Sequence, residues 1–208
     1  MKKKDFAALA KRLLPHLAGF TVKGPMLFIQ PVKHTLRGIY FEGSSFDARS
    51  FYVWMFFMPL CVPTNHVGFN LGRRVRGVGG GDRWNAAAPN LLAELGAALK
   101  HEALPFLGGI ESLHDVAKAA TALQTSQDPY VQEAIAYALA RAGDVAQAAM
   151  ALDQLVGLLD EKVPWQCEMA DRARALKSQI VSNPADVQRQ LAAWEAENVR
   201  NLGLEAFR

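Results

Sequence analysis

The sequence predicts an α+β protein in which an N-terminal helix and an antiparallel sheet of about four strands precede a helical bundle or helical-hairpin region. Three observations predict this class. Strand-like segments are confined to residues 20–76, short turns join them, and apolar residues recur at helical spacing before and after them. We therefore expect an antiparallel-sheet domain over residues 1–84 and a helical domain over residues 85–208, packed on or beside it.

An amphipathic pattern predicts the N-terminal helix. Its apolar residues lie on one side of a helical wheel and its lysines and Arg12 lie elsewhere. Pro15 is expected to kink or end this helix near Leu14, and Gly19 to stop it. The apolar positions are Phe6, Leu9, Ala10, Leu13, Leu14 and Leu17.

The strands are predicted by β-branched and aromatic enrichment between turn residues. TVKGPMLFIQPV reads as one or two short strands broken at Gly24-Pro25, and Thr35 to Gly43 forms the next. Residues 46–60 form a long strand, and residues 66–76 form another. Short connections between consecutive strands predict hairpins, and hence a meander.

The long strand contains FYVWMFFMPLCVP, which is apolar on both faces. A membrane-spanning helix needs about 20 apolar residues. This run has 13 residues, two of them prolines, and is therefore too short to cross a bilayer. Strand alternation places Phe51, Val53, Met55 and Phe57 on one face. The N-terminal helix most simply covers one face, and C-terminal helices, a partner or an apolar ligand cover the other. The second face consists of Tyr52, Trp54, Phe56 and Met58.

Capping signals predict the helices of the C-terminal region. Ser112 and Asp115 form a capping box, Asp128-Pro129 opens another helix, and Gly143-Asp144 ends that helix and caps the next. The segment YALARAGDVAQAAMALDQL is similar to one tetratricopeptide-type unit. Because no second copy follows at a fixed period, we expect a single helical hairpin within a bundle.

The composition indicates a folded protein in a reducing compartment. The chain is 50% hydrophobic and 21% charged, and its two cysteines, Cys61 and Cys167, do not suggest a disulfide scaffold. The N-terminus is basic, but Asp5, Lys11 and Arg12 interrupt the apolar stretch that a signal peptide needs, so neither a signal peptide nor membrane association is expected. We predict a cytoplasmic location.

Charge is unevenly distributed along the chain. Residues 1–85 contain 13 Lys and Arg against 4 Asp and Glu, whereas residues 86–208 contain 10 against 16. The two parts could neutralise each other, or the basic part could bind an acidic partner.

Motifs for catalysis or metal binding are weak. The five histidines have no recognised metal-ligand spacing, and Cys61 and His66 do not match a zinc motif. An apolar setting raises the pKa of a thiol, so a structural role for Cys61 is the favoured interpretation. The sequence predicts no catalytic residues, no metal and no cofactor.

A basic, glycine-rich segment, GRRVRGVGGGDRW, is the clearest candidate site. It contains Arg73, Arg74, Arg76 and Arg83 but no dinucleotide or phosphate-loop motif. These arginines could contact an anion, a nucleic-acid backbone or an acidic protein. The alternative interpretation is a solvated strand end followed by a linker.

Two further segments carry a resemblance. GFTVKG (Gly19 to Gly24) and HEALPFLGGIESLHDV (His101 to Val116) resemble a family of mostly bacterial proteins whose shared domain has no assigned function. The resemblance covers about the first 120 residues. It implies an N-terminal helix, an antiparallel sheet and no known catalytic residues. Some proteins of this kind resemble immunity proteins that bind toxins.

The leading hypothesis is a non-enzymatic protein-binding module. A role like that of an immunity protein is one form of this hypothesis. The first alternative is a nucleic-acid or anion-binding module that uses the four arginines of the glycine-rich segment. The second alternative is an enzyme that acts on a small or apolar molecule, with Cys61 or His66 in its site. Neither the partner nor the oligomeric state follows from the sequence.

Overall fold

The computed structural model describes residues 2–77, 79–123 and 127–208. The chain divides into two compact units. The sheet unit consists of Met1–Phe57, Gly72–Gly109 and Phe207–Arg208. The helical unit consists of Met58–Leu71 and Ile110–Ala206.

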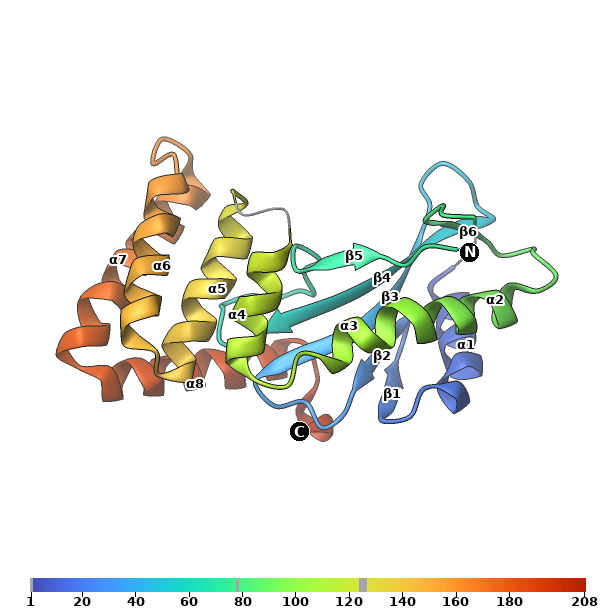
Figure 1. The fold of residues 1–208 in the computed structure, drawn as a ribbon, viewed down its shortest axis with the longest axis horizontal. Helices are drawn as coiled ribbons and strands as arrows, with labels where there is room; N and C mark the ends of the chain where they lie inside the picture. Colours follow the sequence, from blue (N-terminus) through green and yellow to red (C-terminus); the bar gives the residue numbers. More distant parts are fainter. Residues whose placement is uncertain (1, 78, 124–126) are drawn as a thin grey trace. The chain divides into compact units, whose positions relative to one another are not determined.

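The predicted α+β class is confirmed, because an N-terminal helix and an antiparallel sheet precede a helical region (Figure 1). The compact units differ from the predicted ranges 1–84 and 85–208. Residues 85–109 pack with the sheet, and residues 58–71 pack with the helices. The predicted boundary of independent domains stays a prediction.

The sheet unit begins with α1 (Lys3–Leu13) and the short 3-10 helix η1 (Leu14–His16), as Pro15 predicts. Six strands form one sheet within the described residues, in the order β1-β2-β3-β4-β5, and β6 also pairs with β4. The strand pairs β1–β2, β2–β3, β4–β5 and β4–β6 are antiparallel. The strands are β1 (Phe20–Lys23), β2 (Met26–Ile29), β3 (Thr35–Gly43), β4 (Ser50–Pro59), β5 (Gly72–Arg74) and β6 (Arg83–Asn85).

Two strand predictions differ from the structure in extent. The long strand begins at Ser50, because the Asp47 side chain accepts hydrogen bonds from the Arg49 backbone and the Ser50 hydroxyl and stabilises a turn instead. Of the predicted strand 66–76, only β5 is a strand. The short β6 was not predicted, because three residues carry too little alternation.

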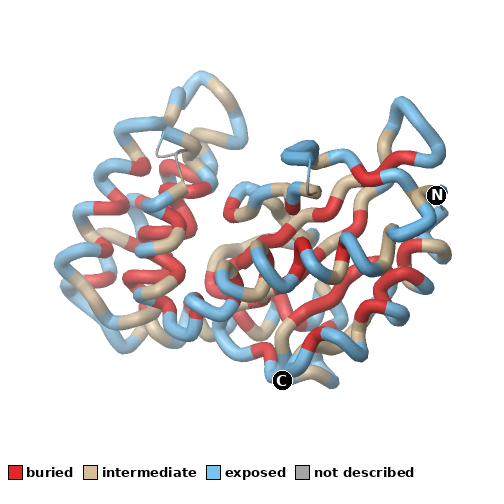
Figure 2. Tube along the Cα trace, turned by 45° about the vertical axis from the view of Figure 1, so that its right-hand side comes forward, coloured by how far each residue is buried: buried red, intermediate tan, exposed pale blue. Residues whose placement is uncertain are grey.

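One face of the sheet is covered by helices. Phe51, Val53 and Met55 share a core with residues from α1 and from the helical segment that follows β6. The Phe6 and Phe51 rings lie 5.7 Å apart. The prediction that the N-terminal helix covers one face of the long strand is therefore confirmed. Figure 2 shows the buried stretches along these strands in red.

The helical segment that follows β6 in the sheet unit contains a short π-helix. α2 (Leu91–Ala98) continues through the π-helix η2 (Leu99–Ala103) into α3 (Leu104–Gly108). Pro105 is the second residue of α3, and the helical segment continues past it to Gly108. The π-helix changes the hydrogen-bond register just before Pro105, where a continuous α-helix would clash with the proline ring.

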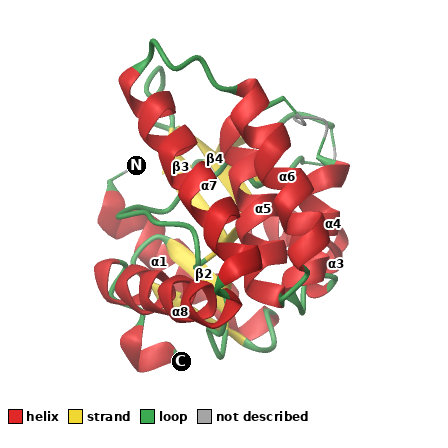
Figure 3. Ribbon diagram, turned by 90° about the vertical axis from the view of Figure 1, so that its left-hand side faces the viewer, coloured by secondary structure: helices red, strands yellow, loops and turns green. Residues whose placement is uncertain are grey.

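The helical unit consists of α4 (Leu113–Ala122), α5 (Pro129–Ala142), α6 (Val145–Leu158), α7 (Pro164–Ser182) and α8 (Pro184–Asn201), followed by η3 (Glu205–Phe207) at the junction with the sheet unit. Helix α5 packs against α4, α6 and α8, and residues 131–140 are all buried. Helices α6 and α7 also pack together (Figure 3).

The capping predictions for this unit are confirmed at three helices. Ser112 accepts a hydrogen bond from the Asp115 backbone, and Asp128 accepts one from Tyr130. Gly143 has a φ of +86°, where a side chain would be strained, and Asp144 then caps α6. The α5–α6 hairpin follows the predicted helix-turn-helix segment.

Polar pairs lie inside the helical unit. Glu133 on α5 is buried and accepts a hydrogen bond of 2.9 Å from Arg172 on α7. Asn198 on α8 donates to the carbonyl oxygens of Leu60 and Val62 and accepts from the Thr64 backbone. These bonds attach the segment Met58–Leu71 to the helices, since buried backbone groups need partners. None of the helices in the described ranges has both the length and the hydropathy of a membrane span.

Gly38 on β3 is a position where packing excludes a larger residue. A Cβ atom there would lie 2.8 Å from the Leu27 carbonyl oxygen and 3.2 Å from the Phe56 ring. We expect Gly38→Ala to lower the free energy of unfolding by about 1–3 kcal/mol, because the backbone of β2 must shift. Denaturant unfolding measures this loss.

Gly96 in α2 provides the matched control. A Cβ atom there meets nothing within 4 Å. Gly96→Ala is expected to leave stability unchanged or raise it by about 0.5–1 kcal/mol, because alanine favours a helix. Equal effects of the two substitutions would contradict the packing argument.

Candidate functional site

The basic, glycine-rich segment leaves and rejoins one edge of the sheet. β5 pairs with Trp54–Phe56 of β4, and β6 pairs with Ser50–Tyr52 farther along the same strand. The residues between them form a turn, in which the Gly77 N–H donates to the Gly81 carbonyl at 2.8 Å. Both ends of the segment therefore belong to the sheet unit. Val78 lies outside the described residues.

Trp84 holds the base of this turn. Its indole N–H donates to the Val75 carbonyl at 3.2 Å, and its side chain is buried. Gly80 has a φ of +80°, a conformation that glycine adopts without strain. The glycines therefore allow a tight turn at the sheet edge. The flanking strands β5 and β6 fix the two ends of the segment that carries the arginines.

Arg74 covers the aromatic face of β4. Its guanidinium carbon lies 3.7 Å from the centre of the Tyr52 ring and 4.9 Å from that of Trp54. The same guanidinium forms an ion pair of 3.0 Å with Asp82, and the Trp54 indole donates to Glu42 at 2.8 Å. The Arg74 guanidinium therefore makes cation–π contacts with two rings and an ion pair with one carboxylate.

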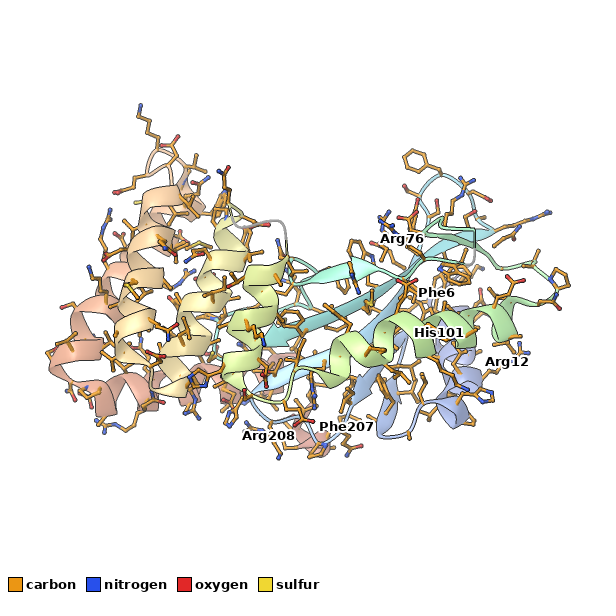
Figure 4. All side chains as sticks on the ribbon, viewed as in Figure 1. Phe6, Arg12, Arg76, His101, Phe207 and Arg208 are labelled. Carbon is orange, nitrogen blue, oxygen red and sulfur yellow. The ribbon has the colours of Figure 1, made fainter. Side chains whose placement is uncertain are left out.

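The structure separates the four residues of the predicted apolar face into two pairs. Tyr52 and Trp54 are partly exposed beneath Arg74, whereas Phe56 and Met58 are buried. Nearby on this sheet, Phe28 of β2 packs edge-on against Phe207 at 5.1 Å. Figure 4 labels Phe207 near the end of the chain. The role of Tyr52, Trp54, Phe56 and Met58 as a partner or ligand face stays a prediction.

Three of the four predicted arginines line one pocket of about 1050 Å³, which we call the arginine pocket. Arg73 lies on the opposite face of β5 from Arg74 and stacks over the Phe106 ring at 5.1 Å. Arg76 is exposed on the segment between β5 and β6 (Figure 4). The lining consists of Trp54, Arg73, Arg74, Arg76, Gly80, Gly81, Asp82 and Glu102.

Arg83 does not line the arginine pocket. It is exposed on β6, opposite Tyr52, and acts electrostatically on Asp47 in the turn between β3 and β4. Hydrogen bonds from Ser50 and from the Arg49 backbone lower the pKa of Asp47, and Arg83 adds to this effect. The same turn carries Phe46, whose side chain is 93% exposed.

Two carboxylates of the arginine pocket were not predicted. Asp82 pairs with Arg74, and Glu102 of η2 accepts a hydrogen bond of 3.3 Å from the Arg76 backbone. Asp82 is close to the arginines in the sequence and could have been included. Glu102 could not, because only the packing of the helical layer on the sheet brings it there.

The candidate nucleophile of the enzyme hypothesis is enclosed. Cys61 is fully buried, and burial, with a smaller contribution from Glu195, raises the pKa of its thiol to about 12. His66 is exposed, and its Nδ1 lies 2.9 Å from the Asn65 side chain. Across the described ranges, no three His, Cys, Asp or Glu side chains are grouped so as to hold a metal ion.

The chain matches no protein-family model, no curated protein and no solved structure. The resemblance to the bacterial family with the GFTVKG and LPF segments therefore stays an expectation.

Arg74 stabilises the sheet edge as well as shaping the pocket. We expect Arg74→Ala to lower the free energy of unfolding by about 1–2 kcal/mol, because it removes two aromatic contacts and the ion pair with Asp82. Arg76→Ala is the control, since its exposed side chain has no such contacts, and it should change stability by less than about 0.5 kcal/mol. Denaturant unfolding of both variants checks this, and a loss equal to that of Arg76→Ala would contradict the stacking role.

Thiol labelling tests the assignment of Cys61. At about pH 8 the Cys61 thiol is protonated and shielded, because this pH lies far below its raised pKa, so an aromatic disulfide reagent should modify only Cys167 in the native protein. Both thiols should react after unfolding. In Cys167→Ser, native labelling should disappear. Rapid native labelling of that variant would instead reopen the enzyme hypothesis.

Proposed function

We propose that this protein is a non-enzymatic protein-binding module, located in the cytoplasm, that uses the arginine pocket to contact its partner. The observation that carries the proposal is the composition of that pocket. Arg73, Arg74 and Arg76 lie beside Trp54 within reach of two carboxylates. Arginine and tryptophan are the residues most often found at energetically dominant positions of protein interfaces.

The arginines are partly ordered before any partner binds. Arg73 rests on Phe106, and Arg74 rests on Tyr52 and Trp54 while it pairs with Asp82. Binding therefore costs less side-chain entropy than it would for free arginines. A partner carboxylate can accept two parallel hydrogen bonds from a guanidinium positioned in this way.

The mixed charge of the pocket favours a protein over a polyanion. Asp82 and Glu102 lie among the arginines and would repel a row of phosphates, but they can pair with basic side chains on a protein partner. Phe46, exposed on the turn between β3 and β4, adds an apolar contact elsewhere on the sheet unit. A binding role of the immunity-protein kind agrees with this chemistry.

Nucleic-acid or anion binding is the second candidate. The sheet unit contains 15 Lys and Arg against 6 Asp and Glu, a formal charge of +9. Such a charge attracts polyanions without a specific site. An enzyme that uses Cys61 is the third candidate, and the burial of that thiol argues against it.

Affinity capture with matched variants tests the protein-binding proposal. The wild-type chain is used to capture proteins from nuclease-treated lysate of the native host. Arg73→Ala with Arg76→Ala removes two exposed charges of the pocket, and Lys11→Ala with Arg12→Ala removes two exposed charges from α1. We expect one protein to be retained by the wild type and the α1 variant and lost, by about tenfold or more, from the pocket variant.

Two outcomes count against the proposal. Capture of no protein, or equal capture by both double variants, would contradict a role of the arginine pocket in protein binding. Short labelled oligonucleotides provide the second measurement. Binding that requires Arg73 and Arg76 and weakens steeply with salt would favour the nucleic-acid alternative.

A further inference from the structure

The helical unit exposes a stacked pair of aromatic side chains. The Tyr130 and Trp165 rings lie 5.2 Å apart with an angle of 7° between their planes. Tyr130 is 47% exposed and Trp165 is 41% exposed. Their contact joins α5 to α7 and leaves a large aromatic surface in contact with water. Tyrosine and tryptophan are enriched where proteins bind partners.

The pair is held rigidly. Each residue is the second of its helix and follows a proline, Pro129 in α5 and Pro164 in α7. The Tyr130 backbone N–H donates to the capping Asp128 side chain at 2.9 Å. Both rings are thus placed by helix starts whose backbone is restricted, so that little entropy is lost when a partner covers them.

The unit that carries the stack has a negative formal charge. The helical unit contains 14 Asp and Glu against 8 Lys and Arg, a formal charge of −6. Glu168 lies three residues beyond Trp165 on α7, which places both on the same side of the helix. Its side chain is exposed and has no ion-pair partner among the residues that the structure describes.

Three other carboxylates, each within five positions of one of the rings in the sequence, already have partners. Asp128 caps α5, and Glu161 pairs with Arg174, which holds the pKa of Glu161 below its usual value. Asp160 accepts a hydrogen bond of 3.0 Å from the Lys162 backbone. Glu168 is therefore the carboxylate beside the stack that is available to an incoming cation.

We propose that the Tyr130–Trp165 stack and Glu168 form a docking surface for an arginine- or lysine-rich segment of a basic protein. A guanidinium or ammonium group would stack on the exposed aromatic surface and pair with Glu168. The negative formal charge of the helical unit increases the association rate of such a segment. The surface shares no residue with the arginine pocket, because its residues belong to the helical unit and those of the pocket to the sheet unit.

Peptide binding to the full-length protein tests the proposal. The probe is a fluorescein-labelled peptide of alternating arginine and glycine, followed by anisotropy at moderate salt. We expect Trp165→Ala to weaken binding about fivefold to tenfold, a change between that of an exposed and that of a fully desolvated cation–π contact. Glu168→Gln should weaken binding about threefold, and Tyr130→Phe, which keeps the ring, should change it little.

Glu197→Gln is the matched control, since it removes one exposed carboxylate from α8 in the same unit. Equal weakening by Glu168→Gln and Glu197→Gln would show only general attraction to a negative surface and overturn the proposal. Stronger binding of an uncharged proline-rich peptide, dependent on Trp165 but not on Glu168, would also overturn it. Circular dichroism of Trp165→Ala distinguishes lost binding from lost folding, and Glu168→Gln tests the site without altering the stack.

Discussion

The structure of the sheet unit depends on the burial of β4, whose large side chains project from both faces. Each such side chain stabilises the fold by about 1.5–3 kcal/mol when it is removed from water. Helices α1 and α2–α3 cover the face that carries Phe51, Val53 and Met55. This one requirement explains why residues 85–109 pack with the sheet although their sequence is helical.

The opposite face of β4 is covered in part by a charged side chain, Arg74, instead of by apolar side chains. Arg74 lies over Tyr52 and Trp54 and pairs with Asp82, while Glu42 accepts from the Trp54 indole. The Trp54 indole and the Asp82 carboxylate therefore have partners at this edge, whereas the buried Nε of Arg74 has no hydrogen-bond partner among the described residues. The arrangement places a basic, aromatic and partly ordered surface where the edge strand is interrupted between β5 and β6. A surface of this composition suits contact with a protein that carries charges of both signs.

In the helical unit, buried polar side chains are paired with one another and with backbone groups. Helix α5 is buried along residues 131–140, so the buried Gln132 and Glu133 side chains need partners inside. Glu133 pairs with Arg172, and Gln132 donates to the Ala151 carbonyl and to Gln154. Burial raises the pKa of Glu133, and the hydrogen bond from Arg172 opposes that shift. The stacked rings of Tyr130 and Trp165 lie outside this core, which is why they are available to a partner.

Local patterns in the chain were enough to predict the fold class and several helix starts. Periodicity located the N-terminal helix, alternation located β3 and β4, and short caps such as Ser112 and Asp128 located helix starts, because each of these signals depends on neighbouring residues. The arginines of the site were predicted in the same way, from their closeness in sequence. Only the tertiary structure decided that Arg74 covers Tyr52, that Glu102 joins the pocket and that Tyr130 stacks on Trp165. These contacts join residues that lie 20 or more positions apart. They depend on how helices and strands pack, and single-sequence periodicity carries no information about that packing.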